Sequence, residues 1–303
     1  MYPIYGIILD IRTNVYIKEK EGRIMKRFEN KVAVVTGAAG AGAGGTGKAI
    51  AQGLAKEGAS VVLVDINEEN GKATEKEFLD AGYDVFFVKC DVTQEDQIKT
   101  VISNTIEKYK KINILVNVAF ITVPSGEGLV ENLDVSTWDK IFSVNIRGTF
   151  LMAKHCLPYL VKNDSSSIVN VSSTSTLGSD DINTAYASSK GAMNIFSRYV
   201  ATQYGREGLR CNTVIPGLIL SKENDALFYQ DPASKDFFDE LDRHLLINRH
   251  ASGEDIANAV LFLADDEAAA CITGQALVVD GGMSIHNPTW AQWRENSKDP
   301  GKM

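Results

Sequence analysis

Short apolar runs rich in β-branched residues alternate with helical patterns between residues 31 and 279, and this alternation most restricts what the chain can fold into. The runs lack the polar–apolar alternation of half-exposed strands, so each predicts a strand that is buried on both faces. Strands joined by helices form a parallel sheet, and right-handed connections place helices on both of its faces. The sequence therefore predicts an α/β fold with one doubly wound parallel sheet of about seven strands. Strands are expected at 31–36, 60–65, 85–88, 112–117, 167–172, 210–215 and 275–279, and helices at 48–57, 68–79, 94–110, 136–160, 184–204 and 254–263.

Composition and charge argue against several classes of protein. The 303 residues carry a formal net charge of −8 without a basic block, so nucleic acid is not an expected partner. No stretch reaches the roughly 18 consecutive apolar residues of a membrane span, and residues 2–17 lack the pattern of a signal peptide. The cysteines form no Cys-x-x-Cys pair, which predicts reduced thiols in a cytoplasmic protein and no metal site. They are Cys90, Cys156, Cys211 and Cys271.

A glycine-rich segment lies between the first predicted strand and the first helix. Glycines at such a turn let the backbone approach a pyrophosphate, and the helix N-terminus offers free N–H groups. Two registers fit the Gly-x-Gly-x-x-Gly pattern: Gly40, Gly42 and Gly45, or Gly42, Gly44 and Gly47. Asp65 ends the second strand, where a carboxylate can bind the ribose hydroxyls of NAD and would repel the 2′-phosphate of NADP. Because no Lys or Arg adjoins Asp65, the pattern favours NAD(H).

Three further residues suggest proton transfer. Tyr186 and Lys190 are four positions apart at the start of a predicted helix, so they share one helical face. An ammonium beside a phenol favours the phenolate and lowers the phenol pKa, which suits Tyr186 to exchange a proton with a carbonyl or alcohol. Ser173 follows the fifth strand, at the sheet edge where ligands bind, and its hydroxyl can hold the substrate oxygen.

The motifs together resemble the short-chain dehydrogenase/reductase family over about residues 28–284. They are Thr36-Gly37, Gly45-x-Gly47, Asp65, Asp91-Val92, Asn117-x-Ala119, Asn145, Ser173, Tyr186-x-x-x-Lys190 and Pro216-Gly217. The resemblance implies a Rossmann-type fold and an NAD(H)-dependent oxidoreductase that interconverts a ketone and a secondary alcohol, with the chemistry carried by the cofactor. It also implies three segments: an N-terminal extension at 1–26, a dinucleotide-binding and catalytic domain at 27–286 with a substrate lid at about 221–250, and a C-terminal tail at 287–303.

The resemblance assigns roles residue by residue. Tyr186 is the expected acid–base, Lys190 binds the nicotinamide ribose and lowers the pKa of Tyr186, and Ser173 orients the carbonyl. Asn145 is expected to position a water that relays protons from Lys190. Cofactor contacts are expected from Gly37, Gly45, Thr46, Gly47, Asp65, Ile66, Asp91, Val92, Asn117, Ala119, Tyr186, Lys190, Pro216, Gly217, Ile219 and Ser221.

The chain departs from the family pattern at two places. About four residues are inserted between Gly37 and Gly45, which leaves open which glycines contact phosphate. The family's Asn-Asn-Ala-Gly reads Asn-Val-Ala-Phe here, with Val118 in place of an amide and Phe120 in place of a small residue. Either the surrounding packing compensates for these two residues, or they shift one wall of the active site.

The predicted lid carries an apolar helical stripe at positions 237, 238, 241 and 245, which is typical of core packing and, over an active site, favours a bulky apolar substrate. By analogy the leading expectation is a hydroxysteroid, such as a 20-keto or 20-hydroxysteroid. A sugar or polyol, a small diketone and a 3-oxoacyl thioester remain alternatives. An alternative of another class is a non-catalytic dinucleotide-binding scaffold or sensor.

Two expectations concern assembly and the N-terminus. The helices at 136–160 and 184–204 resemble the pair that forms the interface of family tetramers, which predicts a homotetramer, with a dimer as the second choice. Residues 5–11 and 15–18 are β-prone runs separated by a plausible turn at 12–14, which predicts a hairpin. Either the N-terminal segment is a simple tail, or it packs on the body or a neighbouring subunit and tunes activity.

Overall fold

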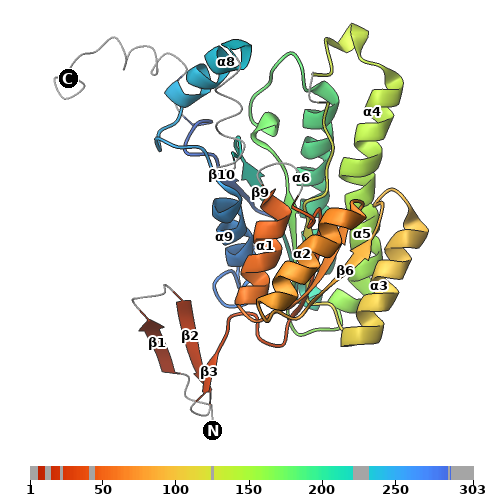
Figure 1. The fold of residues 1–303 in the computed structure, drawn as a ribbon, viewed down its shortest axis with the longest axis vertical. Coiled ribbons are helices and arrows are strands. Elements are labelled where there is room, and N and C mark those ends of the chain that lie inside the picture. The colour runs from red at the N-terminus through yellow and green to blue at the C-terminus, as the bar shows by residue number, and fades with distance from the viewer. Residues whose placement is uncertain are drawn as a thin grey trace, which may run out of the picture.

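The computed structural model of the protein describes residues 6–10, 15–20, 23–40, 45–123, 126–220, 232–285 and 287. Its centre is an all-parallel sheet of seven described strands in the order β10-β9-β8-β7-β4-β5-β6 (Figure 1). The strands are β4 (Val32–Thr36), β5 (Ser60–Asp65), β6 (Val85–Lys89), β7 (Ile114–Asn117), β8 (Ser166–Val171), β9 (Leu209–Pro216) and β10 (Ala276–Val279). The doubly wound parallel sheet predicted from the sequence is confirmed.

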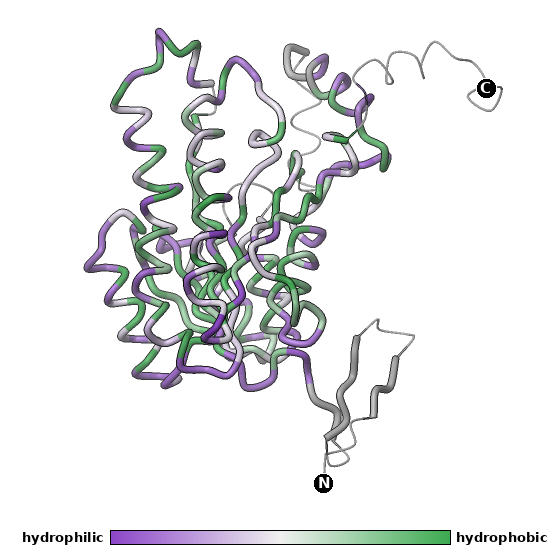
Figure 2. The backbone as a smooth tube through the Cα atoms, turned by 180° about the vertical axis from the view of Figure 1, so that it is seen from behind, coloured by the Kyte–Doolittle hydropathy of each residue, from purple (hydrophilic) through white to green (hydrophobic). Residues whose placement is uncertain are grey.

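Helices cover both faces of this sheet. They are α1 (Thr46–Lys56), α2 (Glu68–Asp80), α3 (Glu95–Tyr109), α4 (Val135–Phe142), α5 (Thr149–Leu160), α6 (Thr184–Tyr204), α8 (Pro232–Arg243) and α9 (Gly253–Ala264). One hydrophobic cluster includes Leu54 of α1 and Val260 of α9, and the other includes Met152 of α5 and Val200 of α6. Figure 2 shows the hydrophobic residues concentrated along the middle of the fold, where strands and helices meet.

The strand order changes direction at β4, which pairs with β5 on one side and with β7 on the other. Chain connections leave the carboxyl ends of β4 and β7 in opposite directions, so a crevice opens between them, and α/β sheets bind ligands at this point. This topology positions the site described below. No described helix combines the length and the apolar composition that crossing a membrane requires.

The segment predicted as one helix at 136–160 contains a π-helical stretch. Residues Ser143–Gly148 are π-helical, between α4 and α5. The wider turn holds Asn145, whose side chain is fully buried and bonds outside its own helix. π-helical turns of this kind often occur at functional sites.

Two regions outside the seven-stranded sheet had been predicted in part. The N-terminal segment forms a separate antiparallel sheet of β1 (Gly6–Asp10), β2 (Val15–Lys20) and β3 (Arg23–Met25), in which the β1–β2 pair is the predicted hairpin. Within the predicted lid, α8 is helical as expected, whereas residues 221–231 lie outside the described residues.

Candidate active site

A cavity of about 330 Å³ opens at the carboxyl ends of β4, β5, β6 and β7. It is lined by eight of the residues predicted to contact a cofactor: Gly37, Thr46, Gly47, Asp65, Ile66, Asp91, Val92 and Ala119. Asn67, Cys90, Phe120, Ile121 and Val144 also line it, although the sequence did not single them out for cofactor binding. An elongated ligand bound where the strand order changes direction would lie across these four strand ends.

The glycine turn fits a pyrophosphate. Gly37 has a φ of +70°, and Gly45 is the N-cap residue of α1 with a φ of +67°, in the left-handed region that favours glycine. A Cβ at Gly47 would overlap the Gly37 carbonyl oxygen, so the helix packs against the turn only because glycine is present. These three glycines therefore leave no side chain of their own in front of the free N–H groups of α1, so a pyrophosphate can come close to them. Residues 41–44, which include the remaining glycines of the two registers, lie outside the described residues.

Asp65 is held in place at the end of β5. Its Oδ2 accepts a hydrogen bond from the Ala39 N–H at 3.0 Å, and its Oδ1 accepts one from the Asn67 N–H at 3.0 Å. Two backbone donors therefore orient the carboxylate on the cavity wall while leaving it lone pairs for further donors. The geometry suits recognition of a pair of ribose hydroxyls.

The expected catalytic residues meet beside this cavity. Tyr186 and Lys190 lie on the first two turns of α6, and Ser173 follows β8 and hydrogen-bonds the Tyr186 side chain. Lys190 is 1% exposed, and its Nζ donates to the Val171 carbonyl oxygen at 2.8 Å. The Lys190 Nζ lies 5.8 Å from the centroid of the Tyr186 ring. The structure thus groups a phenol, an ammonium and a hydroxyl that are distant in sequence.

Burial shifts the pKa values of both Tyr186 and Lys190. Burial raises the pKa of Tyr186 above its ordinary value, and the hydrogen bond from Ser173 only partly opposes this rise. Burial also lowers the pKa of Lys190 to about 7. In the structure burial therefore dominates the pKa of Tyr186, and the expected lowering of this pKa by Lys190 stays a prediction.

Asn145 makes contacts that brace the site. Its Oδ1 accepts a hydrogen bond from the Ile121 N–H at 2.8 Å, and its Nδ2 donates to the Ile121 carbonyl at 3.1 Å and to Ser189 Oγ at 3.0 Å. The Asn145 side chain therefore connects the segment that follows β7 to α6. Its expected role in positioning a water stays a prediction.

Asn117 lies in the sheet rather than on the cavity wall. Its Nδ2 donates to Asn170 Oδ1 at 2.8 Å, and Asn170 Nδ2 in turn donates to Ser197 Oγ at 2.8 Å. These buried amides connect β7, β8 and α6. Its expected contact with a cofactor stays a prediction.

Both departures from the family pattern lie on the wall of the cavity. Val118 is buried in a hydrophobic cluster and also lines the cavity. Phe120 lines the cavity as well, with its ring 6.0 Å from the Tyr186 ring and 5.1 Å from the Lys190 Nζ. An aromatic face at this distance attracts an ammonium. Phe120 therefore forms a wall between the cavity and the catalytic pair.

Four of the expected cofactor contacts stand at the end of β9 or after it: Pro216, Gly217, Ile219 and Ser221. The Gly217 N–H donates to the Val279 carbonyl at 3.0 Å, and Ile219 forms a bridge with Ala251. Pro216, Gly217 and Ile219 are not among the residues that line the described cavity. Ser221 lies outside the described residues.

Sequence reasoning missed Glu127. This residue is 8% exposed, and its carboxylate accepts hydrogen bonds from the backbone N–H groups of Ala185 and Tyr186. A charged residue between two glycines, Gly126 and Gly128, was the available signal. Its partner could not be identified from spacing, because the partner lies 58 residues further along the chain.

Comparisons with known proteins agree with this geometry. Residues 40–284 match the family model described as enoyl-(acyl carrier protein) reductase. The chain is 35% identical over 270 residues to the 7alpha-hydroxysteroid dehydrogenase of Bacteroides fragilis, covering 88% of this chain and 98% of that protein.

Solved structures give the same result. A short-chain dehydrogenase/reductase from Burkholderia xenovorans has a TM-score of 0.78 and 33% identity, covering 86% of this chain and 99% of that one. A structure described as a D-mannonate oxidoreductase from Haemophilus influenza, with bound NAD, has a TM-score of 0.80 and 26% identity, covering 86% of this chain and 97% of that one. With the strand order, the glycine turn and the Ser–Tyr–Lys group, these matches establish that the chain belongs to the short-chain dehydrogenase/reductase family of oxidoreductases, whose members bind a nicotinamide dinucleotide.

Proposed function

We propose that the protein is an NAD(H)-dependent oxidoreductase that interconverts a ketone and a secondary alcohol. The observation that carries this proposal is the grouping of Ser173, Tyr186 and Lys190, with the Lys190 Nζ 5.8 Å from the Tyr186 ring, beside a cavity at the carboxyl ends of the strands. A hydroxyl and a phenol that both donate to one carbonyl oxygen can hold that oxygen in place, and the phenol can give it a proton.

Each residue then has a defined task. A bound nicotinamide dinucleotide would supply or accept the hydride. Tyr186 gives its phenolic proton to the carbonyl oxygen in reduction and accepts it back in alcohol oxidation. Ser173 orients that oxygen through its hydroxyl. Lys190, whose pKa of about 7 lets it gain or lose a proton near neutrality, restores the protonation of Tyr186 between turnovers.

The preference for NAD(H) over NADP(H) rests on Asp65. Its carboxylate is fixed by two backbone donors on the cavity wall, and Ile66 and Asn67, which also line the cavity there, carry no positive charge. A 2′-phosphate at this place would meet a like charge. Similarity to the NAD-bound structure described as a D-mannonate oxidoreductase supports the same choice.

The cofactor preference is tested with Asp65→Asn and Asp65→Ala. The wild type should use NADH with a higher kcat/KM than NADPH. Both variants should narrow this preference by about 10-fold, since each removes the like-charge repulsion, and only the Asn variant keeps a hydrogen-bond acceptor. Equal use of the two cofactors by the wild type would contradict the assignment.

The leading substrate class is a hydroxysteroid, such as a 20-keto or 20-hydroxysteroid. Similarity to the 7alpha-hydroxysteroid dehydrogenase supports a steroid, and so do the exposed Leu246 and Ile247 in the segment after α8. Phe238 and Leu245, by contrast, are buried, so part of the predicted apolar stripe is core. A sugar-related substrate is the second candidate, favoured by the similarity to the structure described as a D-mannonate oxidoreductase. A small diketone or a 3-oxoacyl thioester would use the same chemistry.

The test of the whole proposal is oxidation of NADH against a panel of steroid ketones, sugar acids, small diketones and 3-oxoacyl thioesters. Turnover of one class, with Tyr186→Phe inactive on the same class, supports the proposal. NADH binding without turnover of any class would instead favour a dinucleotide-binding scaffold.

We also propose a homotetramer that acts in the cytoplasm. Phe150, Ile195 and Tyr199 are exposed apolar side chains on α5 and α6. Phe150 also lines a hollow of about 290 Å³ with other residues of both helices, and these features support helix pairing between subunits. The four cysteines are free thiols, which is typical of a reducing compartment. Light scattering of the full chain at micromolar concentration distinguishes a tetramer from the alternative dimer or a monomer.

A further inference from the structure

Glu127 is a buried carboxylate that the mechanism above does not use. It lies in the segment between β7 and α4, and its side chain is directed away from solvent with 8% of the residue exposed. Gly126 and Gly128 flank it with φ values of +83° and +77°. A Cβ at Gly126 would come within 3.1 Å of the Ile182 Cβ, so the glycine lets this segment lie against the chain that leads into α6.

The carboxylate binds the first turn of the catalytic helix. Its Oε2 accepts a hydrogen bond from the Ala185 N–H at 2.5 Å, and its Oε1 accepts one from the Tyr186 N–H at 3.0 Å. The Glu127 N–H donates to the Ile182 carbonyl oxygen at 2.7 Å. Three hydrogen bonds therefore join this segment to the start of α6.

These contacts replace the usual local cap. The N-cap residue of α6, Asn183, makes no side-chain hydrogen bond to the helix. The first N–H groups of a helix have no partner within the helix, and Ala185 is fully buried, so solvent does not reach this turn easily. A carboxylate at this end also interacts favourably with the helix dipole. Glu127 thus caps the helix from 58 residues away in the sequence.

The capped turn is the one that carries Tyr186. One turn further along, Lys190 is anchored to the sheet by its bond to the Val171 carbonyl. The backbone of Tyr186 is instead anchored by Glu127, and its phenol must reach the Ser173 hydroxyl. Small displacements of a reacting group reduce the rate strongly, so a loose first turn would weaken proton transfer while leaving the distant ribose and adenine contacts intact.

We propose that Glu127 is a positioning residue, which fixes the first turn of α6 and thereby holds the Tyr186 phenol in register with Ser173. The kinetic part of this inference rests on the proposed function. The structural part does not, because it concerns only the hydrogen bonds of the Ala185 and Tyr186 amides.

The test uses Glu127→Ala, which removes both acceptors, and Glu127→Gln, which keeps one. Glu131→Ala is the matched control, since Glu131 is exposed in the same segment. Steady-state kinetics should give a kcat about 10-fold lower for the Ala variant and an intermediate value for the Gln variant. The Kd for NADH should stay within about twofold, because the cofactor cavity is lined by other residues.

Hydrogen exchange of the full-length protein provides the readout that needs no substrate. The amides of Ala185 and Tyr186 should exchange at least about 10-fold faster in Glu127→Ala than in the wild type or in Glu131→Ala. A wild-type kcat in Glu127→Ala overturns the positioning role, and so does a parallel loss of kcat and NADH affinity. Unchanged exchange at these amides overturns the cap, and this result is independent of whether any carbonyl is reduced.

Discussion

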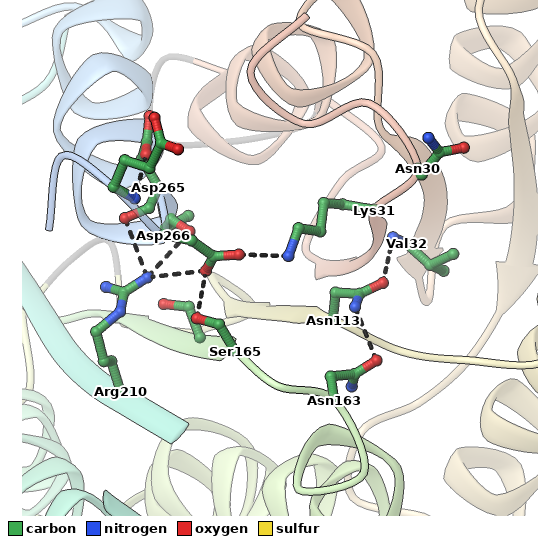
Figure 3. A network of polar contacts seen from close by, with 12 residues as sticks. Asn30, Lys31, Val32, Asn113, Asn163, Ser165, Arg210, Asp265 and Asp266 are labelled. Carbon is green, nitrogen blue, oxygen red and sulfur yellow. Dashed lines mark hydrogen bonds and ion pairs between the residues drawn. The ribbon is translucent and has the colours of Figure 1, made fainter. Parts of the chain in front are cut away.

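Two buried cations lie at opposite ends of the same sheet, and they differ in how their charge is compensated. At the carboxyl end, Lys190 is 1% exposed and donates to the Val171 carbonyl oxygen. At the amino end, Arg210 in β9 is 6% exposed, and its guanidinium donates to the carbonyl oxygens of residues 263–265 and to Asp266 (Figure 3). Arg210 therefore has a carboxylate partner, whereas the described contacts of Lys190 are a carbonyl and two aromatic rings.

The amino end carries a polar network that joins several elements. Asp266 accepts hydrogen bonds from Arg210, Lys31 and Ser165, so it joins the segment after α9 to the starts of β4, β8 and β9 (Figure 3). Close by, Asn113 accepts a bond from the Val32 N–H and donates to Asn163. These bonds hold strand ends together and leave little room for change.

The comparison separates charge used for structure from charge used for chemistry. Burial lowers the pKa of Arg210 as well, but Asp266 opposes the fall and a guanidinium stays protonated in proteins. Lys190 has a pKa of about 7 and can exchange a proton at neutral pH. The carboxyl end, beside the proposed catalytic residues, thus keeps a cation without a carboxylate partner among the described residues. The amino end pairs its cation with a carboxylate.

The largest expected effect is on chemistry at the carboxyl end. Tyr186→Phe should lower kcat by about 10²- to 10⁴-fold, because it removes the proton donor while keeping the ring. NADH binding, followed by fluorescence titration, should be nearly unchanged. Tyr199→Phe, an exposed position on the same helix, is the control. Turnover of Tyr186→Phe near the wild-type rate would contradict the chemical role that distinguishes the carboxyl end of the sheet from the amino end.

The next effect concerns stability at the amino end. Arg210→Met should lower the free energy of unfolding by about 3 kcal/mol, because Asp266 and the carbonyl oxygens at the end of α9 lose a buried donor. Urea unfolding measures the change. The kcat of the folded variant should equal that of the wild type, since Arg210 lies at the far end of the sheet. A stable variant with reduced kcat would show that the network serves the active site instead.

Lys190→Met should have the opposite sign. In the folded protein the pKa of Lys190 is about 7, below its ordinary value of 10.5. Between these pH values the unfolded chain binds more protons, so the cost of burying Lys190 is complete below pH 7 and disappears as the pH rises toward 10.5. The Met variant should therefore be more stable than the wild type by about 2 kcal/mol at acidic pH, with the difference shrinking above neutrality.

Urea unfolding of both proteins from about pH 6 to pH 10 measures this trend. The difference in unfolding free energy between variant and wild type should change with pH for Lys190→Met. It should stay constant for Arg210→Met, because the guanidinium does not titrate in this range. A Met variant that is less stable at pH 6 would mean that the Lys190 charge is better compensated than its described contacts indicate.

Local regularities made most of the fold predictable. The strand Ser60–Asp65 and the helix Thr184–Tyr204 have the bounds expected from their residues alone. The π-helical turn at Ser143–Gly148 was not predicted, because the hydrogen bonds of Asn145 to Ile121 and Ser189 cross between elements. Periodicity within one helix carries no information about such partners.

The positions of several site residues could also be predicted from the sequence. Gly37, Asp65 and Asp91 line the cavity as expected, because each follows a strand and parallel strands end at one edge of the sheet. The upward shift of the Tyr186 pKa required the tertiary structure, because the burial that causes it depends on which segments cover the phenol. Phe120 and Glu127 required coordinates to place.

The sequence by itself determined the order of strands and helices, the glycine turn, and the four-residue spacing that puts Tyr186 and Lys190 on one face of a helix. All of these depend on residues that are close along the chain. Tertiary structure alone decided the protonation of Lys190, the wall formed by Phe120 and the cap supplied by Glu127. The physical reason is that burial and capping depend on which distant segments come together, and the low-dielectric interior makes those contacts strong enough to govern the chemistry.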